Sequence, residues 1–462
     1  MRRFVLLPCV LSFLLACAAA VAQQPAAEPP PDAAAPDARP QEVRISDRVV
    51  LVRDPSMRTV QFTMVVRAGC ADEPGLRCRG VAHFLEHLVA ARRNADHSEA
   101  VSAFFPDGTS NAWTSHRATG YVHRLPRRAS TEADLERLFG FYAGKLRGFE
   151  ATPEDAARER NIVLQEYHVR VSASPFARFQ ARLEGVLLPD HPLGRFVGGT
   201  PETIAELTLE DARAFHKAWY AINNAFFVVA GDVSELALKA IVEKTLSGLP
   251  EQPLPERGWR ALFPVEPLDA TIREASDEVR RRSVSAARLV RLEDDDPTLR
   301  PARELLSSFL RSQLPGSPHD FLVEREGVTD AVGFADVTRL VPGIYRATLA
   351  AEPHDETDPD RLAAAMRAYW GDLAARGIDA RNLERLKKRH AESLRLAERQ
   401  GDRVYARVVD WLGVGNEYDT LAVWPRRIAA VTVDDVNRLI RAVAGSGREV
   451  TGILVPGEGK AP

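Results

Sequence analysis

Hydrophobic and polar positions along the chain follow the same order twice. Strand-like runs of apolar and β-branched residues cover residues 59–67 and 283–291. Near the end of each copy, a Thr followed by acidic residues indicates a helix start, and an apolar run of strand length comes after the helix. The helix starts are residues 208–211 and 432–435, and the runs are residues 226–232 and 450–455. Since the members of each pair are about 224 residues apart, the pattern predicts two diverged copies of one α+β unit.

Changes in composition separate these copies from the rest of the chain. Residues 23–44 are rich in Ala, Pro and Asp and lack hydrophobic periodicity, which indicates a disordered tether. A Pro-rich stretch predicts a linker at residues 250–267. The expected fold class is therefore α+β, with two tandem homologous domains at residues 45–249 and 268–458.

The first 22 residues, 1–22, have the pattern of an export signal. Two Arg residues precede an apolar run, and Ala20-Val21-Ala22 comes directly before a polar segment. The apolar run is too short to span a bilayer. We expect cleavage after Ala22 and export to the periplasm. The alternative is a lipid anchor at Cys17, because residues 14–17, Leu-Leu-Ala-Cys, resemble a bacterial lipobox.

Charge and cysteine content narrow the class of protein further. The formal net charge is −3 with both signs interspersed, so we expect no nucleic-acid partner. Beyond the export signal the chain has only Cys70 and Cys78. In an oxidising compartment such a close pair is a disulfide candidate, and two unpaired thiols are the alternative.

One short motif, His83-Phe84-Leu85-Glu86-His87, predicts metal chemistry. Residues four apart share a face of a helix, so His83 and His87 can hold one metal ion while Glu86 lies beside it. Zinc takes neutral nitrogen ligands, and a neighbouring carboxylate can accept a proton from a zinc-bound water. The alternative is a pair of solvated helix histidines. At the same offset the second copy has Ser307, Leu310 and Arg311, which predicts no second metal site.

A third ligand is expected from a helix within residues 152–170. Its start has a Thr that can cap the helix and a Pro at the first helical position. Glu159 and Glu166 are seven residues apart and therefore share a face of this helix. An ordinary solvated acidic face is the alternative.

Residues 80–88 resemble the active-site signature of the pitrilysin-type inverted zincins, the family of insulysin and the mitochondrial processing peptidases. Residues 159–166 resemble that family's E-R-x-x-V-x-x-E helix. The resemblance implies one Zn²⁺ per chain, with Glu166 as the third ligand and Glu159 as the carboxylate that orients a ligand. It also implies that the strand with Asn111 and Ala112 binds the backbone of an extended peptide.

The second copy departs from this family in one respect. Small bacterial members often have an Arg and a Tyr that reach the substrate carbonyl at a neighbouring subunit's zinc. This chain has Arg325, but Thr329 or Asp330 stands where the Tyr is expected. A surface ion pair is the alternative role of Arg325. We therefore expect a heterodimer with a related zinc-free subunit, and a homodimer is the alternative.

The function expected from these features is an exported zinc metallopeptidase that cleaves extended peptides or unfolded polypeptides. In this mechanism Glu86 acts as the general base beside the zinc ion. The alternative is a non-catalytic assembly or binding subunit of a peptidase complex.

Overall fold

The computed structural model describes residues 39–90, 108–126, 132–292, 298–341, 343–413 and 423–457. The predicted signal, residues 1–22, lies outside this part of the chain together with Cys17, most of the tether and residue 458. Within it no helix is both long and apolar enough to cross a membrane.

The first domain contains a six-stranded sheet in the order β1-β2-β6-β3-β5-β4. Its central strand β6 has the sequence AFFVVAG and is buried throughout, as expected for a strand covered on both faces. The strands are β1 (Gln41–Arg44), β2 (Val49–Arg53), β3 (Thr59–Val66), β4 (Thr109–Thr114), β5 (Thr119–Pro126) and β6 (Ala225–Gly231). Strand β1 corrects the tether boundary: its residues pair with β2, and Val43 packs against the core.

Seven helices accompany this sheet among the described residues. Most begin at a Ser or Thr cap or a Pro, which satisfies or removes the free N–H groups of the first turn. They are α1 (Val81–Ala90), α3 (Glu132–Arg147), α4 (Pro153–Tyr167), α5 (Pro175–Leu187), α6 (Pro201–Ala205), α7 (Leu209–Trp219) and α8 (Glu235–Leu246). A π-helical turn, His168–Ser172, continues α4.

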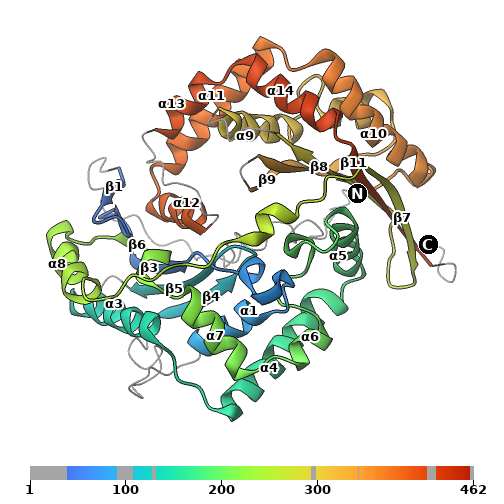
Figure 1. The fold of residues 1–462 in the computed structure, drawn as a ribbon. Helices are drawn as coiled ribbons and strands as arrows, with labels where there is room; N and C mark the ends of the chain where they lie inside the picture. The colour runs from blue at the N-terminus through green and yellow to red at the C-terminus, as the bar shows by residue number, and fades with distance from the viewer. Residues whose placement is uncertain are drawn as a thin grey trace, which may run out of the picture.

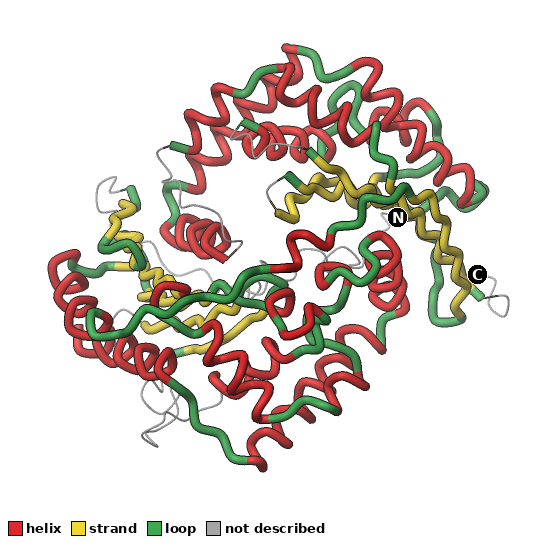
Figure 2. The backbone as a smooth tube through the Cα atoms, viewed as in Figure 1, coloured by secondary structure: helices red, strands yellow, loops and turns green. Residues whose placement is uncertain are grey.

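The second domain has a five-stranded sheet in the order β7-β11-β8-β10-β9. Its strands are β7 (Leu268–Ser276), β8 (Ser283–Arg291), β9 (Val332–Val341), β10 (Ile344–Ala351) and β11 (Arg448–Pro456). Its α-helices are α9 (Leu299–Leu310), α10 (Pro359–Arg376), α11 (Ala380–Ala397), α12 (Gly401–Gly413), α13 (Trp424–Ala430) and α14 (Val433–Ala444), with a π-helical turn at Asp320–Arg325. In each domain most helices form an outer layer and the strands lie toward the middle of the molecule (Figure 2).

Both sheets have the same plan, which confirms the tandem α+β fold class. Strand β2 is parallel to β6 as β7 is parallel to β11, and antiparallel strands follow in the same order. The capping boxes of α7 and α14 also correspond, with Thr208 and Asp211 in one and Thr432 and Asp435 in the other. The repeat predicted from the hydrophobic pattern is therefore a repeat of structure.

Each domain contributes one helix to the other domain's sheet. Helix α5 packs on β11, where the side chains of Phe179 and Leu183 fill the space beside Gly452. Helix α12 packs on β6 and β3, and its Tyr405 hydroxyl is hydrogen-bonded to Thr63. Figure 1 shows both helices between the two sheets. The exchange buries apolar surface of both domains in shared clusters, so we expect them to unfold together.

The predicted linker is ordered against the first domain. It contains a 3-10 turn, Gly258–Leu262, in which Trp259 is only 2% exposed. The Trp259 indole N–H donates to Asp72, and the backbone oxygen of Trp259 is hydrogen-bonded to His191. The Pro-rich linker is therefore a segment packed on the first domain and not a freely moving connection.

Candidate metal centre and active site

The His83–His87 motif lies on α1, a helix buried along almost its whole length. The helix begins after Gly80, which has a φ of 97° and no side chain to cap the first turn. Instead, the Glu73 carboxylate accepts hydrogen bonds from the backbone N–H groups of Arg79, Gly80 and Ala82. Burial raises the pKa of Glu73 to about 8, against the opposing effect of these hydrogen bonds.

Helix α4 supplies the carboxylates opposite α1. Thr152 and Asp155 form a capping box, and Pro153 occupies the first helical position, as the sequence predicts. The helix packs against α1, so its Glu159 and Glu166 both reach the histidines.

His83, His87 and Glu166 form one cluster in which every pair of ligand atoms lies within 4.8 Å. His83 Nε2 is 3.6 Å from Glu166 Oε2, and His87 Nε2 is 3.5 Å from Glu166 Oε1. Ligand atoms about 2.0–2.1 Å from a tetrahedral zinc ion are roughly 3.4 Å apart, so these separations fit zinc. Among the described residues Glu166 Oε2 is buried without a hydrogen-bond partner, although the Arg170 guanidinium forms an ion pair with it at 3.1 Å.

The two histidines differ in their electrostatic surroundings. Burial, with the nearby charges of His87 and Arg170, lowers the pKa of His83 to about 3, so this ring is a neutral nitrogen donor at neutral pH. Burial also lowers the pKa of His87, but the hydrogen bond that His87 donates to Glu159 and the negative charges of Glu86 and Glu166 outweigh it and raise the pKa overall.

Glu159 contacts His87 at Nδ1, the ring nitrogen that does not face Glu166. Its Oε2 is 3.4 Å from His87 Nδ1, an arrangement that leaves Nε2 of the same ring directed at Glu166. The hydrogen bond with His87 lowers the pKa of Glu159. A carboxylate on the far nitrogen of a metal-binding imidazole fixes its tautomer and its orientation.

Glu86 lies beside the cluster and outside the ligand set. Its Oε2 is 4.0 Å from His83 Nε2 and accepts a 2.7 Å hydrogen bond from the Thr114 hydroxyl. Burial raises the pKa of Glu86 to about 7, although the positive charge of His87 and the Thr114 hydrogen bond act in the opposite direction. A carboxyl group with this pKa can exchange protons in both directions near neutrality.

The predicted substrate strand is the edge of the first sheet. Asn111 and Ala112 lie on β4, which pairs only with β5 in the described sheet, and Asn111 is exposed. Thr114, the Glu86 partner, ends the same strand. Trp113 lies against Gly120 on the neighbouring strand and close to Gly413 at the end of α12.

Arg325 does not belong to this cluster. It lies in the second domain, where its guanidinium pairs with Asp372 at 3.3 Å and lies over the Phe321 ring. Thr329 is buried and donates to the backbone of Glu352, and Asp330 pairs with His354. Within this chain, the structure therefore gives Arg325 the role of an ion-pair residue.

Cys70 and Cys78 form a disulfide with a Cα–Cα distance of 4.7 Å. The bridge closes the loop that contains Glu73 and leads into α1. In the second domain, Ser307 hydrogen-bonds to the backbone of Val337 and Arg311 pairs with Asp336, so both positions have structural partners.

The roles of three residues near the site were not predicted from the sequence. Thr114 binds the general-base candidate, Glu73 caps α1, and Arg170 lies 3.1 Å from Glu166 Oε2. The spacing of Glu166 and Arg170, one helical turn apart, is a signal that could have indicated that pair. Contacts of Thr114 and Glu73 depend on tertiary packing and leave no comparable local pattern.

Comparison with known proteins identifies the family of the chain. Residues 48–195 match the family described as "Insulinase (Peptidase family M16)", and residues 206–389 match "Peptidase M16 inactive domain". An uncharacterized zinc protease from Mycobacterium leprae is 30% identical over 201 residues, which cover 43% of this chain and 43% of that protein. The chain belongs to the pitrilysin-type M16 peptidase family.

Solved structures show the same fold. A protease from Helicobacter pylori has a TM-score of 0.74 at 20% identity, covering 91% of this chain and 100% of that one. The first half of the periplasmic protease PqqL from Escherichia coli has a TM-score of 0.71 at 18% identity, covering 91% and 92%. The chain spans less than half the length of the curated relatives it matches.

Proposed function

We propose that this chain is an exported zinc-dependent peptidase that hydrolyses peptide bonds in extended peptides or unfolded polypeptides. The observation that supports it most strongly is the cluster of His83, His87 and Glu166 with Glu86 beside it. Both histidine donors, the acidic ligand and a carboxylate outside the ligand set are present in one place.

Zinc bound by these three side chains would polarise the scissile carbonyl and lower the pKa of the attacking water to about 7. Glu86 accepts the proton from that water and passes it to the leaving amine, since its own pKa of about 7 suits both transfers. Thr114 holds Oε2 of Glu86, which keeps the carboxylate oriented toward the histidines. Glu159 keeps His87 in the tautomer with Nε2 available.

The substrate adds a strand to the edge of β4. An extended peptide can pair with the side of β4 that has no strand beside it in the described sheet, so affinity comes from main-chain hydrogen bonds and requires no particular sequence at every position. Because Thr114 ends β4 and contacts Glu86, a peptide on this edge passes beside the proposed general base. Folded proteins are poor substrates, since their backbones are already paired.

Export is proposed from residues 1–22, the pattern of a cleaved signal, with a lipid anchor at Cys17 as the alternative. The Cys70–Cys78 disulfide is typical of a protein in an oxidising compartment. A structural neighbour of similar fold is also named a periplasmic protease.

The active species is proposed to be a heterodimer with a related zinc-free subunit that supplies an Arg and a Tyr. Arg325 is engaged with Asp372 within this chain, and Thr329 and Asp330 stand where the Tyr is expected. A homodimer in which Arg325 serves the opposite copy is the alternative. The Arg325→Ala variant separates them: it slows a homodimer's peptidase activity and leaves a heterodimer's activity unchanged.

A non-catalytic assembly subunit is the second candidate, because residues 206–389 match a domain described as inactive. The histidine cluster, however, lies within the residues 48–195 that match the insulinase family. Zinc content and cleavage of an unstructured peptide by purified protein, alone and with the partner subunit, decide between them. Stoichiometric zinc with metal-dependent cleavage supports the peptidase; zinc-free, inert protein in both assays supports the subunit.

A further inference from the structure

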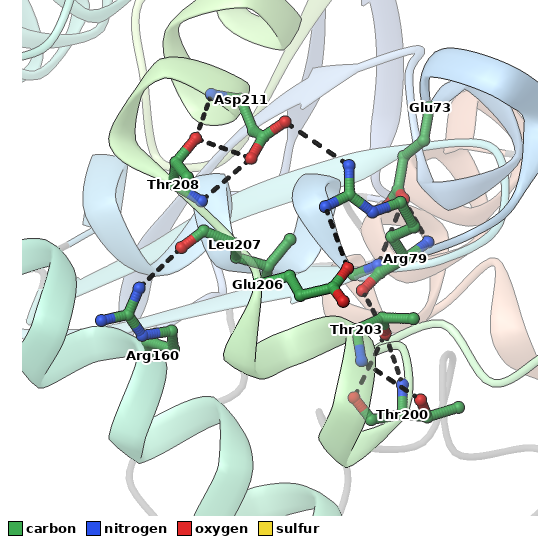
Figure 3. A network of polar contacts seen from close by, with 10 residues as sticks. Glu73, Arg79, Arg160, Thr200, Thr203, Glu206, Leu207, Thr208 and Asp211 are labelled. Atoms are coloured by element: carbon green, nitrogen blue, oxygen red, sulfur yellow. Dashed lines mark hydrogen bonds and ion pairs between the residues drawn. The ribbon is translucent and has the colours of Figure 1, made fainter.

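Glu73 caps the helix of the candidate metal site from outside that helix. It is only 1% exposed. Its Oε2 accepts from the N–H of Arg79, and Figure 3 shows these two residues side by side. The same oxygen accepts from the N–H of Gly80 at 3.1 Å, and Oε1 accepts from the N–H of Ala82 at 3.0 Å. The first N–H groups of a helix have no partner within it, and Gly80 has no side chain to provide one. One carboxylate thus takes the place of an ordinary N-cap.

The start of α1 is also held against a second backbone segment. A side chain at Gly80 would collide with the Gly198 oxygen, and one at Gly199 would collide with the Arg79 oxygen. Gly198 in turn borders the metal-site histidine, since a Cβ there would lie 3.3 Å from His83 Nδ1. A shift of the start of α1 would therefore change the position of the His83 ring.

The loop that carries Glu73 is itself fixed at several points. The disulfide joins its two ends, Cys70 and Cys78. Between them, Asp72 accepts from the Gly69 N–H at 3.1 Å and from the Trp259 indole at 3.0 Å, which ties the loop to the interdomain segment. These contacts hold the loop, and with it Glu73, in a fixed position relative to α1.

We infer that Glu73 is a positioning residue that sets the zinc affinity of the site by fixing the start of α1 and hence the place of His83. This inference rests on the proposed zinc site. A residue of merely structural importance would change the stability of the fold and leave the affinity for zinc unchanged. The two roles are therefore separable by measurement.

The test is a zinc titration of the purified full chain in competition with a chromophoric chelator. Glu73→Gln keeps the shape of the side chain but turns an N–H donor toward at least one backbone N–H. We expect its zinc affinity to fall about 10-fold to 100-fold, the range typical of groups that orient metal ligands. The backbone amides of Arg79, Gly80 and Ala82 should also exchange hydrogen faster.

The matched control is Asp435→Asn, which makes the same carboxylate-to-amide change at the capping box of α14 in the second domain. It should lower the melting temperature without changing the zinc affinity. Wild-type affinity in Glu73→Gln, despite faster amide exchange, overturns the inference. A wild-type chain that binds no zinc overturns both the inference and the proposed function.

A second pair of variants covers the case in which Glu73→Gln does not fold. Glu73→Asp retains the carboxyl group but shortens the reach by one methylene, and the double variant Cys70→Ser/Cys78→Ser retains Glu73 but frees its loop. Both should bind zinc several-fold more weakly than the wild type, with the histidine ligands intact. Unchanged affinity in both variants contradicts the proposed role.

Discussion

The Thr114 hydroxyl donates a 2.7 Å hydrogen bond to Glu86 Oε2, and this contact joins the edge strand β4 to the helix of the candidate metal site. Both side chains are buried. The strand proposed to bind substrate and the carboxylate proposed to move the proton are therefore held in a fixed relation. A peptide paired with β4 is positioned with respect to Glu86 through Thr114 itself.

Thr114→Val should shift the pH dependence of kcat/KM. The hydroxyl lowers the pKa of Glu86, which burial raises to about 7. Without the hydrogen bond the pKa of Glu86 rises further, so more of the base is protonated and the acidic limb moves to higher pH. We expect roughly a tenfold loss of rate at neutral pH, from the loss of a hydrogen bond to a charged group. Thr114→Ser keeps the hydroxyl and should keep the wild-type profile; the same profile in Thr114→Val would argue against this contact.

Glu159→Gln should weaken zinc binding without abolishing it. The neutral amide accepts the hydrogen bond from His87 Nδ1 less strongly than a carboxylate does, so the ring is less firmly oriented. We expect an affinity loss of about 10-fold to 100-fold in a metal competition assay. Glu154→Gln, an exposed carboxylate on the same helix, serves as the control and should bind zinc as the wild type does. Equal zinc affinity in the two variants would show that Glu159 does not contribute to zinc binding.

Leu183→Ala should destabilise both domains together. Leu183 lies on α5 of the first domain but is buried against β11 of the second, beside Gly452. Its truncation leaves a cavity in a shared core, at a cost of about 2–5 kcal/mol in the free energy of unfolding. Denaturant unfolding should remain a single transition at a lower midpoint. Leu236→Ala, at an 80% exposed leucine on α8, should change little. Two separate transitions in the wild type would contradict the coupling of the domains.

Local patterns in the sequence predict much of this architecture. The Thr-acid helix starts at 208–211 and 432–435 and the strand runs at 59–67 and 283–291 all lie at corresponding places in the two sheets. His83, His87 and Glu166 are also found together, because helical spacing places the histidines on one face and the family resemblance indicates the third residue.

Contacts between distant segments could not be predicted in this way. The exchange of α5 and α12 between the domains depends on which apolar faces meet. The pattern of an amphipathic helix predicts an apolar face but does not indicate which element that face packs against. Glu73 lies in a loop without periodicity, and its role depends on the tertiary approach of α1. The ordered linker is a similar case, since the contacts of Trp259 with Asp72 and His191 join segments that are far apart in the sequence.

The central claim is that His83, His87 and Glu166 bind zinc while Glu86 moves the proton. Zinc content and peptide turnover, measured on the same preparations of the wild type and its variants, test it most directly. Glu86→Gln should retain one zinc ion per chain and lose roughly 10²-fold or more in turnover, whereas His83→Ala, His87→Ala and Glu166→Gln should lose the metal as well. Wild-type turnover in Glu86→Gln, or full zinc content in His83→Ala and His87→Ala, would contradict the account.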